Sequence, residues 1–358
     1  VGLPRLNINY DAENDEGVSL TRGSWKMYMD GKFIYADTVM LQVLMRTYEY
    51  SVWDQETNSF SQKSVQKTVL SGEFPDNTGT NKCGRLTRDE EDKMAKDDPL
   101  RYGIKLDPWK DADRLLEEYD ELLILGGNRS GKTEYAARTV ANKMTFNEGI
   151  NTWCLHTTLP SSVEMQQPVV RKYLPPEWRN IGKQGQTTNV RWTDKSGFAD
   201  QVFILPNRSR TRFLNYSMDD KVYEGGELDF IWADELIGYE LVKTLRYRIV
   251  TRSGKLLITF TPVRGYTMTV KEYLAGSRVV ESRPAELLEQ ENIHVPGCKK
   301  GEMPYILEAR SKSAAIICFH SIWNPFGGYE NIIKMLDGKS TEEIKIRAYG
   351  WAERLEGK

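Results

Sequence analysis

An eight-residue segment of this 358-residue chain, Gly126 to Thr133, has the residue types and spacing that bind phosphate groups. It fits the pattern G-x-x-x-x-G-K-[ST]. The glycines let backbone amides turn toward phosphate oxygens, Lys132 can neutralise phosphate charge, and the Thr133 hydroxyl is placed to ligate Mg²⁺. The residues expected to hold the nucleotide cofactor are Gly126, Gly127, Asn128, Arg129, Ser130, Gly131, Lys132, Thr133 and Glu134.

Two adjacent carboxylates end a second apolar run further along the chain. Residues 228–233 are mostly apolar and lead directly to Asp234 and Glu235. Asp234 would hold Mg²⁺ through water, and Glu235 would orient and deprotonate an attacking water. Such a pair at a strand end is often structural, but the upstream phosphate loop favours catalysis. The pattern predicts a Mg²⁺-dependent ATPase with Glu235, Lys132 and Arg129 as catalytic residues.

Three arginines are candidates for stabilising charge in the transition state. Arg129 lies inside the phosphate loop, where building the loop needs no charge, so it could act within its own subunit. The alternative for Arg129 is a surface arginine paired with a carboxylate. Arg246 and Arg248 follow the two acids and are weaker candidates for an arginine that reaches a neighbouring subunit.

A third apolar run, residues 256–260, ends in hydroxyl groups before Pro262. Thr259 and Thr261 could hydrogen-bond the terminal phosphate or the attacking water and report its hydrolysis. Alone, a Thr-Pro pair can simply mark the end of a strand.

For these residues to act together, an α/β fold must bring the C-terminal ends of several strands and the start of one helix close together. Helices are expected over residues 111–119 and 134–144, and buried strands over 122–125, 152–156, 229–233, 256–261 and 315–320. Residues 190–193, 201–205 and 210–216 are expected to form a polar-faced antiparallel insert that turns at Pro206-Asn207.

Residues 1–98 differ from the rest, with short apolar runs separated by turn signals. Asp30-Gly31 lies between two such runs and predicts a hairpin. We expect a small β-rich domain of unknown role over 1–98 and the ATPase domain over 99–358.

Composition excludes several classes of protein. The chain has no run of 18 apolar residues and no basic-then-apolar start, so secretion and membrane insertion are not expected. Its four cysteines lie far apart and are expected to be reduced thiols in an intracellular protein. A net charge of −2 leaves any DNA binding to local basic patches, of which residues 171–212 and 243–255 are the candidates, although either patch could be only a solvated surface.

The motifs together resemble the ATPase domain of tailed-phage terminase large subunits. The resemblance covers residues 100–358 and rests on G-G-N-R-S-G-K-T-E at 126–134, D-F-I-W-A-D-E at 229–235, T-F-T-P at 259–262 and W-N-P at 323–325. It implies the α/β fold of a P-loop NTPase of the additional-strand class, with a mainly parallel central sheet flanked by helices. In the usual family pattern a glutamine before the loop contacts adenine, but here Lys110 stands in that segment, and Tyr102 or Trp109 could stack on the base instead.

The resemblance also implies a role and partners. The chain would use ATP and Mg²⁺ to power translocation of double-stranded viral DNA into a procapsid, self-associating as a ring on the portal protein and working with a terminase small subunit. It would act in the cytoplasm of an infected bacterial host, transiently docked on the procapsid. Family members usually continue into a nuclease domain, and no nuclease activity is expected in residues 1–358.

Two other functions stay open at this stage. The first is a helicase or recombination-type ATPase that uses the same phosphate chemistry on DNA. The second is a non-hydrolysing assembly adaptor that binds ATP as a structural clamp, although a clamp would not need the Glu235 carboxylate.

Overall fold

The computed structural model describes residues 25–29, 32–36, 49–54, 59–64, 82–85, 88–182, 187–265, 267–274, 277–281, 306–309, 314–321 and 324–352. The chain divides into two compact units, residues 1–96 and 97–358. None of the described helices is both long and apolar enough to cross a membrane.

In the first unit, strands β1 (Trp25–Met29) and β2 (Lys32–Ala36) pair antiparallel, as the Asp30-Gly31 turn signal predicts. β1 also pairs with β5 (Lys82–Arg85), while β3 (Glu49–Asp54) pairs with β4 (Ser59–Ser64). Helix α2 spans Arg88–Asp97.

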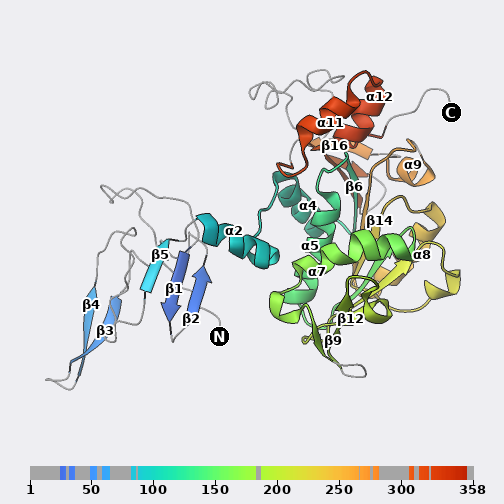
Figure 1. The fold of residues 1–358 in the computed structure, drawn as a ribbon. Helices are drawn as coiled ribbons and strands as arrows, with labels where there is room; N and C mark the ends of the chain where they lie inside the picture. The colour runs from blue at the N-terminus through green and yellow to red at the C-terminus, as the bar shows by residue number, and fades with distance from the viewer. Residues whose placement is uncertain are drawn as a thin grey trace. The chain divides into compact units, whose positions relative to one another are not determined.

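The second unit is built on a sheet of 11 strands within the described residues, in the order β16-β17-β18-β6-β15-β14-β7-β13-β12-β9-β8 (Figure 1). Its six central strands, from β18 to β13, run parallel. They are β18 (Ala314–Phe319), β6 (Glu121–Gly126), β15 (Lys255–Phe260), β14 (Phe230–Asp234), β7 (Asn151–His156) and β13 (Arg210–Asn215).

Antiparallel strands extend both edges of this sheet. One edge carries β16 (Ser277–Glu281) and β17 (Ile306–Ala309), and the other carries β12 (Val202–Ile204), β9 (Asn189–Val190) and β8 (Ile181–Gly182). The short pair β10 (Trp192–Thr193) and β11 (Gly197–Phe198) stands apart. The expected antiparallel pairing of residues 201–205 with 210–216 is confirmed, because β12 pairs antiparallel with β13. The expectation that these residues form an insert is wrong in one respect, because β13 also joins the main sheet parallel to β7.

Helices cover both faces of the sheet because successive strand residues point to opposite sides. Leu122 and Ile124 of β6 pack with α4 (Asp107–Glu118), α5 (Lys132–Phe146) and α7 (Gln167–Tyr173). Leu123 and Leu125 pack with α8 (Tyr239–Ile249) and α9 (Met268–Leu274). The predicted helices and buried strands lie within two residues of α4, α5, β6, β7, β14, β15 and β18, apart from the early start of α4 at Asp107.

The remaining elements are short or lie near the C-terminal end. They are α3 (Pro99–Tyr102), α6 (Leu159–Ser161), η2 (Ser162–Gln166), η3 (Pro176–Trp178), η4 (Ala199–Gln201), η5 (Asp220–Val222), α11 (Tyr329–Leu336), α12 (Thr341–Ile344) and η7 (Lys345–Tyr349). Cys154 and Cys318 are free and buried on the central strands, whereas Cys298 lies outside the described residues.

Candidate functional site

The phosphate loop connects the end of β6 to the start of α5, at the C-terminal ends of the parallel strands. Two of its residues have left-handed backbone, Arg129 at φ 55° and Gly131 at φ 86°. Gly131 is the residue before α5, and its conformation turns the chain directly into the helix. The loop therefore leads into a helix N-terminus, which is the geometry that binds anions.

The loop amides and Lys132 form a cradle for an anion. Within the described part of the chain, no hydrogen bond engages the backbone N–H groups of Gly131, Lys132 or Thr133. The Ser130 hydroxyl is buried without a hydrogen-bond partner among the described residues. Burial lowers the pKa of Lys132, and the carboxylates of Glu235 and Asp234 oppose this shift. Several donors thus converge on one place and lack an acceptor, as a phosphate site requires.

Asp234 ends β14, and Glu235 is the first residue beyond it. Glu235 has φ 67°, an unusual value for a residue with a Cβ atom. Its amide donates to the carbonyl oxygen of Thr259 at 2.7 Å, and the Tyr216 hydroxyl donates to the carbonyl oxygen of Asp234 at 2.6 Å. Neighbouring groups therefore hold the backbone of both acids in one conformation.

A buried chain of hydrogen bonds fixes the Asp234 side chain. The indole Nε1 of Trp232 donates to Thr259 Oγ1 at 2.9 Å, and Thr259 Oγ1 donates to Asp234 Oδ1 at 2.7 Å. Burial raises the pKa of Asp234 to about 7, while the bond from Thr259 works in the opposite direction. Thr259 therefore contacts one of the acids directly.

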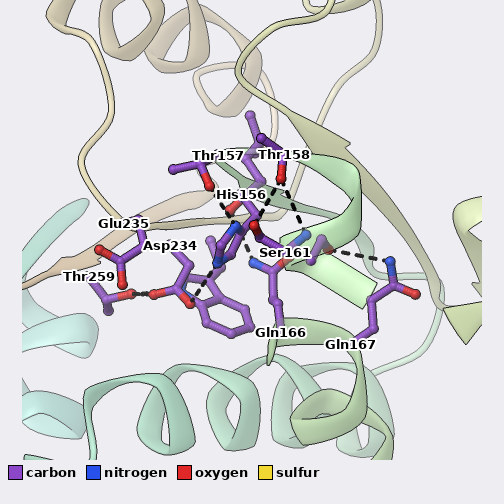
Figure 2. Close-up of polar contacts among 12 residues, drawn as sticks. His156, Thr157, Thr158, Ser161, Gln166, Gln167, Asp234, Glu235 and Thr259 are labelled. Carbon is purple, nitrogen blue, oxygen red and sulfur yellow. Dashed lines mark hydrogen bonds and ion pairs between the residues drawn. The ribbon is translucent and has the colours of Figure 1, made fainter. Parts of the chain in front are cut away.

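His156, at the end of β7, faces the other oxygen of the same carboxyl group. Figure 2 shows Asp234 between Thr259 and His156, with His156 Nε2 lying 3.9 Å from Asp234 Oδ2. Burial lowers the pKa of His156, so its imidazole is neutral at pH 7 and this contact is not an ion pair. Three adjacent strands, β7, β14 and β15, thus place polar groups at one point.

Other candidate residues lie further from this point or have different partners. The Glu134 carboxylate pairs with Lys172 Nζ at 3.0 Å on α7. Arg129 is exposed, and within the described residues its guanidinium has no hydrogen bond or ion pair. Thr261 is half-buried, with no hydrogen bond of its hydroxyl to a described residue.

Arg246 and Arg248 lie near the N-terminal ends of the parallel strands, on the side of the sheet opposite the phosphate loop. Arg246 Nε and Nη2 contact the two carboxylate oxygens of Glu121, the first residue of β6, at 2.7 and 2.9 Å. The carbonyl of Arg248 accepts a hydrogen bond from the amide of Leu228, which precedes β14. Both positions are remote from the phosphate loop of the same chain.

Trp109 is a support for the loop and not a platform for a base. It is only 4% exposed, and a Cβ atom added at Gly131 would lie 3.5 Å from its Nε1. The expectation that Trp109 could stack on adenine is therefore wrong, because the loop and the core cover the ring. Tyr102, by contrast, is 37% exposed.

The residues present fit a nucleotide-bound Mg²⁺ ion. Among the described residues, no three His, Cys, Asp or Glu side chains gather as a metal site. A Mg²⁺ ion bound through phosphate oxygens and water needs only one or two protein groups. Thr133 at the start of α5 and the buried Asp234 carboxyl are groups of that kind.

Sequence reasoning missed three residues around the acids, namely His156, Tyr216 and Trp232. His156 was detectable as a polar residue at the end of a buried strand, the same signal that indicated Asp234. Tyr216 and Trp232 carried no such signal, because their roles depend on which strands lie side by side.

The six-stranded parallel core, with β15 between the loop-bearing β6 and the acid-bearing β14, together with the loop geometry, defines a P-loop NTPase fold. Residues 123–299 match the family described as terminase large subunit, T4-like-virus type, N-terminal. This part of the chain is therefore similar to the N-terminal part of terminase large subunits. No curated protein sequence matches the chain.

The solved structures that match the chain include three phage terminases. An ATPase-domain mutant of the Thermus phage P74-26 large terminase is 16% identical, with a TM-score of 0.49, covering 74% of this chain and 98% of that one. A large terminase of a thermophilic bacteriophage in complex with ADP is 15% identical, with a TM-score of 0.45, covering 68% and 51%. The HK97 bacteriophage large terminase is 12% identical, with a TM-score of 0.37, covering 75% and 56%.

Proposed function

We propose that this chain is the ATPase of a phage DNA-packaging motor, hydrolysing ATP to translocate double-stranded DNA into a procapsid. The match of residues 123–299 to the terminase large-subunit family supports the role. The observation that carries the chemistry is the set of unengaged amides at Gly131–Thr133, beside a buried lysine that is electrostatically coupled to two acids.

In this proposal the loop amides and Lys132 bind the β- and γ-phosphates of ATP. Thr133 and Asp234 hold Mg²⁺, which supplies positive charge to the phosphate oxygens when bound. Thr259 orients the Asp234 carboxyl by donating to Oδ1 and leaves Oδ2 on the side of His156. The raised pKa of Asp234 belongs to the metal-free site, and a bound Mg²⁺ would favour the carboxylate form.

Glu235 is the proposed general base. It receives a proton from the attacking water, and the fixed backbone of Asp234 and Glu235 limits the reorganisation that this step needs. Arg129, exposed and unpaired among the described residues, stabilises charge that develops on the transferred phosphoryl group. Thr261 is kept as a candidate for coupling hydrolysis to movement.

The proposed partners follow from the role. Duplex DNA would contact basic side chains such as Arg210 and Arg212, which are exposed on β13. Portal protein, a small terminase subunit and further copies of this chain in a ring would complete the motor. Arg246 pairs with Glu121 within its own chain, so we do not propose it as the arginine that reaches a neighbouring subunit.

A DNA assay distinguishes the proposed motor from its rivals. At protein concentrations that favour self-association, a motor that moves along duplex DNA removes a triplex-forming third strand with ATP and leaves the duplex paired. Separation of the duplex strands would instead identify a helicase. ATP binding without turnover or displacement would identify an adaptor.

A further inference from the structure

The segment that follows β18 contacts the phosphate loop through two side chains. Ser321 Oγ donates to the carbonyl oxygen of Asn128 at 2.6 Å, and Asn324 Nδ2 donates to the carbonyl oxygen of Arg129 at 2.7 Å. Two donors, nearly 200 positions away in the sequence, therefore hold two consecutive carbonyl groups of the loop.

The end of η7 packs against the same loop through the backbone. The amide of Asn128 donates to the carbonyl oxygen of Arg347 at 2.5 Å. A Cβ atom added at Gly127 would lie 2.3 Å from the carbonyl oxygen of Ala348, and one added at Gly350 would lie 2.6 Å from the Cα atom of Gly126. Glycine at 127 is thus required by this packing as well as by any approach of phosphate.

Holding a carbonyl group also fixes the direction of the next amide. In a trans peptide the C=O of one residue and the N–H of the next point in opposite directions. The bonds from Ser321 and Asn324 therefore set the directions of the N–H groups of Arg129 and Ser130. The N–H of Arg129 has no acceptor among the described residues, whereas the N–H of Ser130 donates to the carbonyl oxygen of Gly127 at 3.3 Å. Arg129 also has a left-handed φ that a residue with a Cβ atom adopts at a cost.

We infer that Asn324 and Ser321 are positioning residues of the nucleotide site. Before the nucleotide binds, Ser321 keeps the Arg129 amide turned away from the donor and toward the phosphate cradle. Asn324 holds the next peptide of the loop, whose Ser130 amide donates to the carbonyl oxygen of Gly127 within the loop. This inference rests on the proposed function for the identity of the ligand, ATP. It extends that function to a segment beyond the phosphate loop, the two acids, Thr259 and Thr261.

The variant Asn324→Asp isolates the donor. The Oδ1 atom of Asn324 accepts a hydrogen bond from the amide of Phe326 at 3.1 Å, and a carboxylate retains this acceptor while losing the donor to Arg129. We expect ATP to bind about tenfold more weakly in Asn324→Asp and about three- to tenfold more weakly in Asn324→Ala, as loss of one hydrogen bond predicts. KM should rise more than kcat falls.

The matched control is Asn147→Ala, at the other end of α5. It also removes an asparagine Nδ2 that donates to a backbone carbonyl, that of Lys143 at 2.8 Å, and it should leave the affinity for ATP unchanged. Equal affinities in Asn324→Asp, Asn324→Ala and this control would overturn the inference.

Hydrogen–deuterium exchange of the nucleotide-free protein separates this inference from the proposed function. Amides of residues 127–131 should exchange faster in Asn324→Asp than in the wild type or in Asn147→Ala, whether or not ATP binds. Unchanged exchange there would contradict a positioning role. A wild type that binds no ATP would instead contradict the proposed function.

Discussion

Replacing Thr259 by valine removes a hydroxyl that links two buried groups while retaining a branched side chain of similar size. Thr259 Oγ1 accepts a hydrogen bond from Trp232 Nε1 at 2.9 Å and donates one to Asp234 Oδ1 at 2.7 Å. Trp232 and Thr259 are completely buried, and Asp234 is 2% exposed. Water therefore has little access to replace the lost partner.

The magnitude follows from the two groups left unsatisfied. A buried donor or acceptor without a partner costs about 1–3 kcal/mol, so the free energy of unfolding should fall by about 2–4 kcal/mol. At roughly 2–4 °C per kcal/mol for a unit of this size, Tm should fall by about 10 °C. Because the Thr259 bond lowers the pKa of Asp234, the variant should also raise that pKa above its value of about 7.

The assay is thermal unfolding at pH 8, where Asp234 is mostly ionised in the wild type. The control is Thr152→Val on β7, which lies two strands from β15 in the same sheet, because the buried hydroxyl of Thr152 has no hydrogen-bond partner among the described residues. That variant should be neutral or slightly stabilising. Equal Tm changes in the two variants would refute the hydrogen-bond chain as the cause.

Three further predictions test separate parts of the site. Because the pKa of Asp234 is raised to about 7, this residue stabilises the nucleotide-free protein at low pH, and that stability is lost as pH rises through about 7. The Tm of wild type relative to Asp234→Asn should therefore fall between pH 5 and pH 8, and a constant difference would contradict the raised pKa. Arg246→Ala should lower stability by about 2 kcal/mol by breaking the Glu121 pair, while the affinity for ATP stays unchanged. Arg129→Ala should lower kcat at least about 100-fold with a smaller change in KM, and an unchanged kcat would exclude a transition-state role.

The helices and strands of the second unit were largely predictable because their sequence signals are local. The apolar runs at 122–125 and 256–260 form β6 and β15, and the glycine-lysine loop leads into α5 as its pattern predicts. Asp234 and Thr259 were also identified individually, since each is a polar residue near the end of an apolar run.

The contacts between these residues could not be predicted, because they depend on strand order and register. Asp234 lies opposite Thr259 because β14 pairs in parallel with β15, and His156 approaches because β7 pairs with β14 on the other side. Asn324 lies in the W-N-P segment, which only the family resemblance indicated. It contacts Arg129 from 195 positions further along the chain, so no local pattern could predict this contact. The role of residues 1–98, the absence of nuclease activity and the DNA contacts stay predictions.

The central claim is that Glu235 activates water at an ATP site. The most direct measurement is steady-state ATP hydrolysis with Mg²⁺ over a wide range of protein concentration, comparing wild type, Glu235→Gln and Glu240→Gln, a control whose glutamate side chain is 85% exposed on α8. The account predicts that turnover per molecule rises with protein concentration in the wild type and equally in Glu240→Gln. In Glu235→Gln, turnover should fall by about 10²- to 10⁴-fold while the variant still binds ATP. Turnover by Glu235→Gln at the wild-type rate, or none by any of the three proteins, would contradict it.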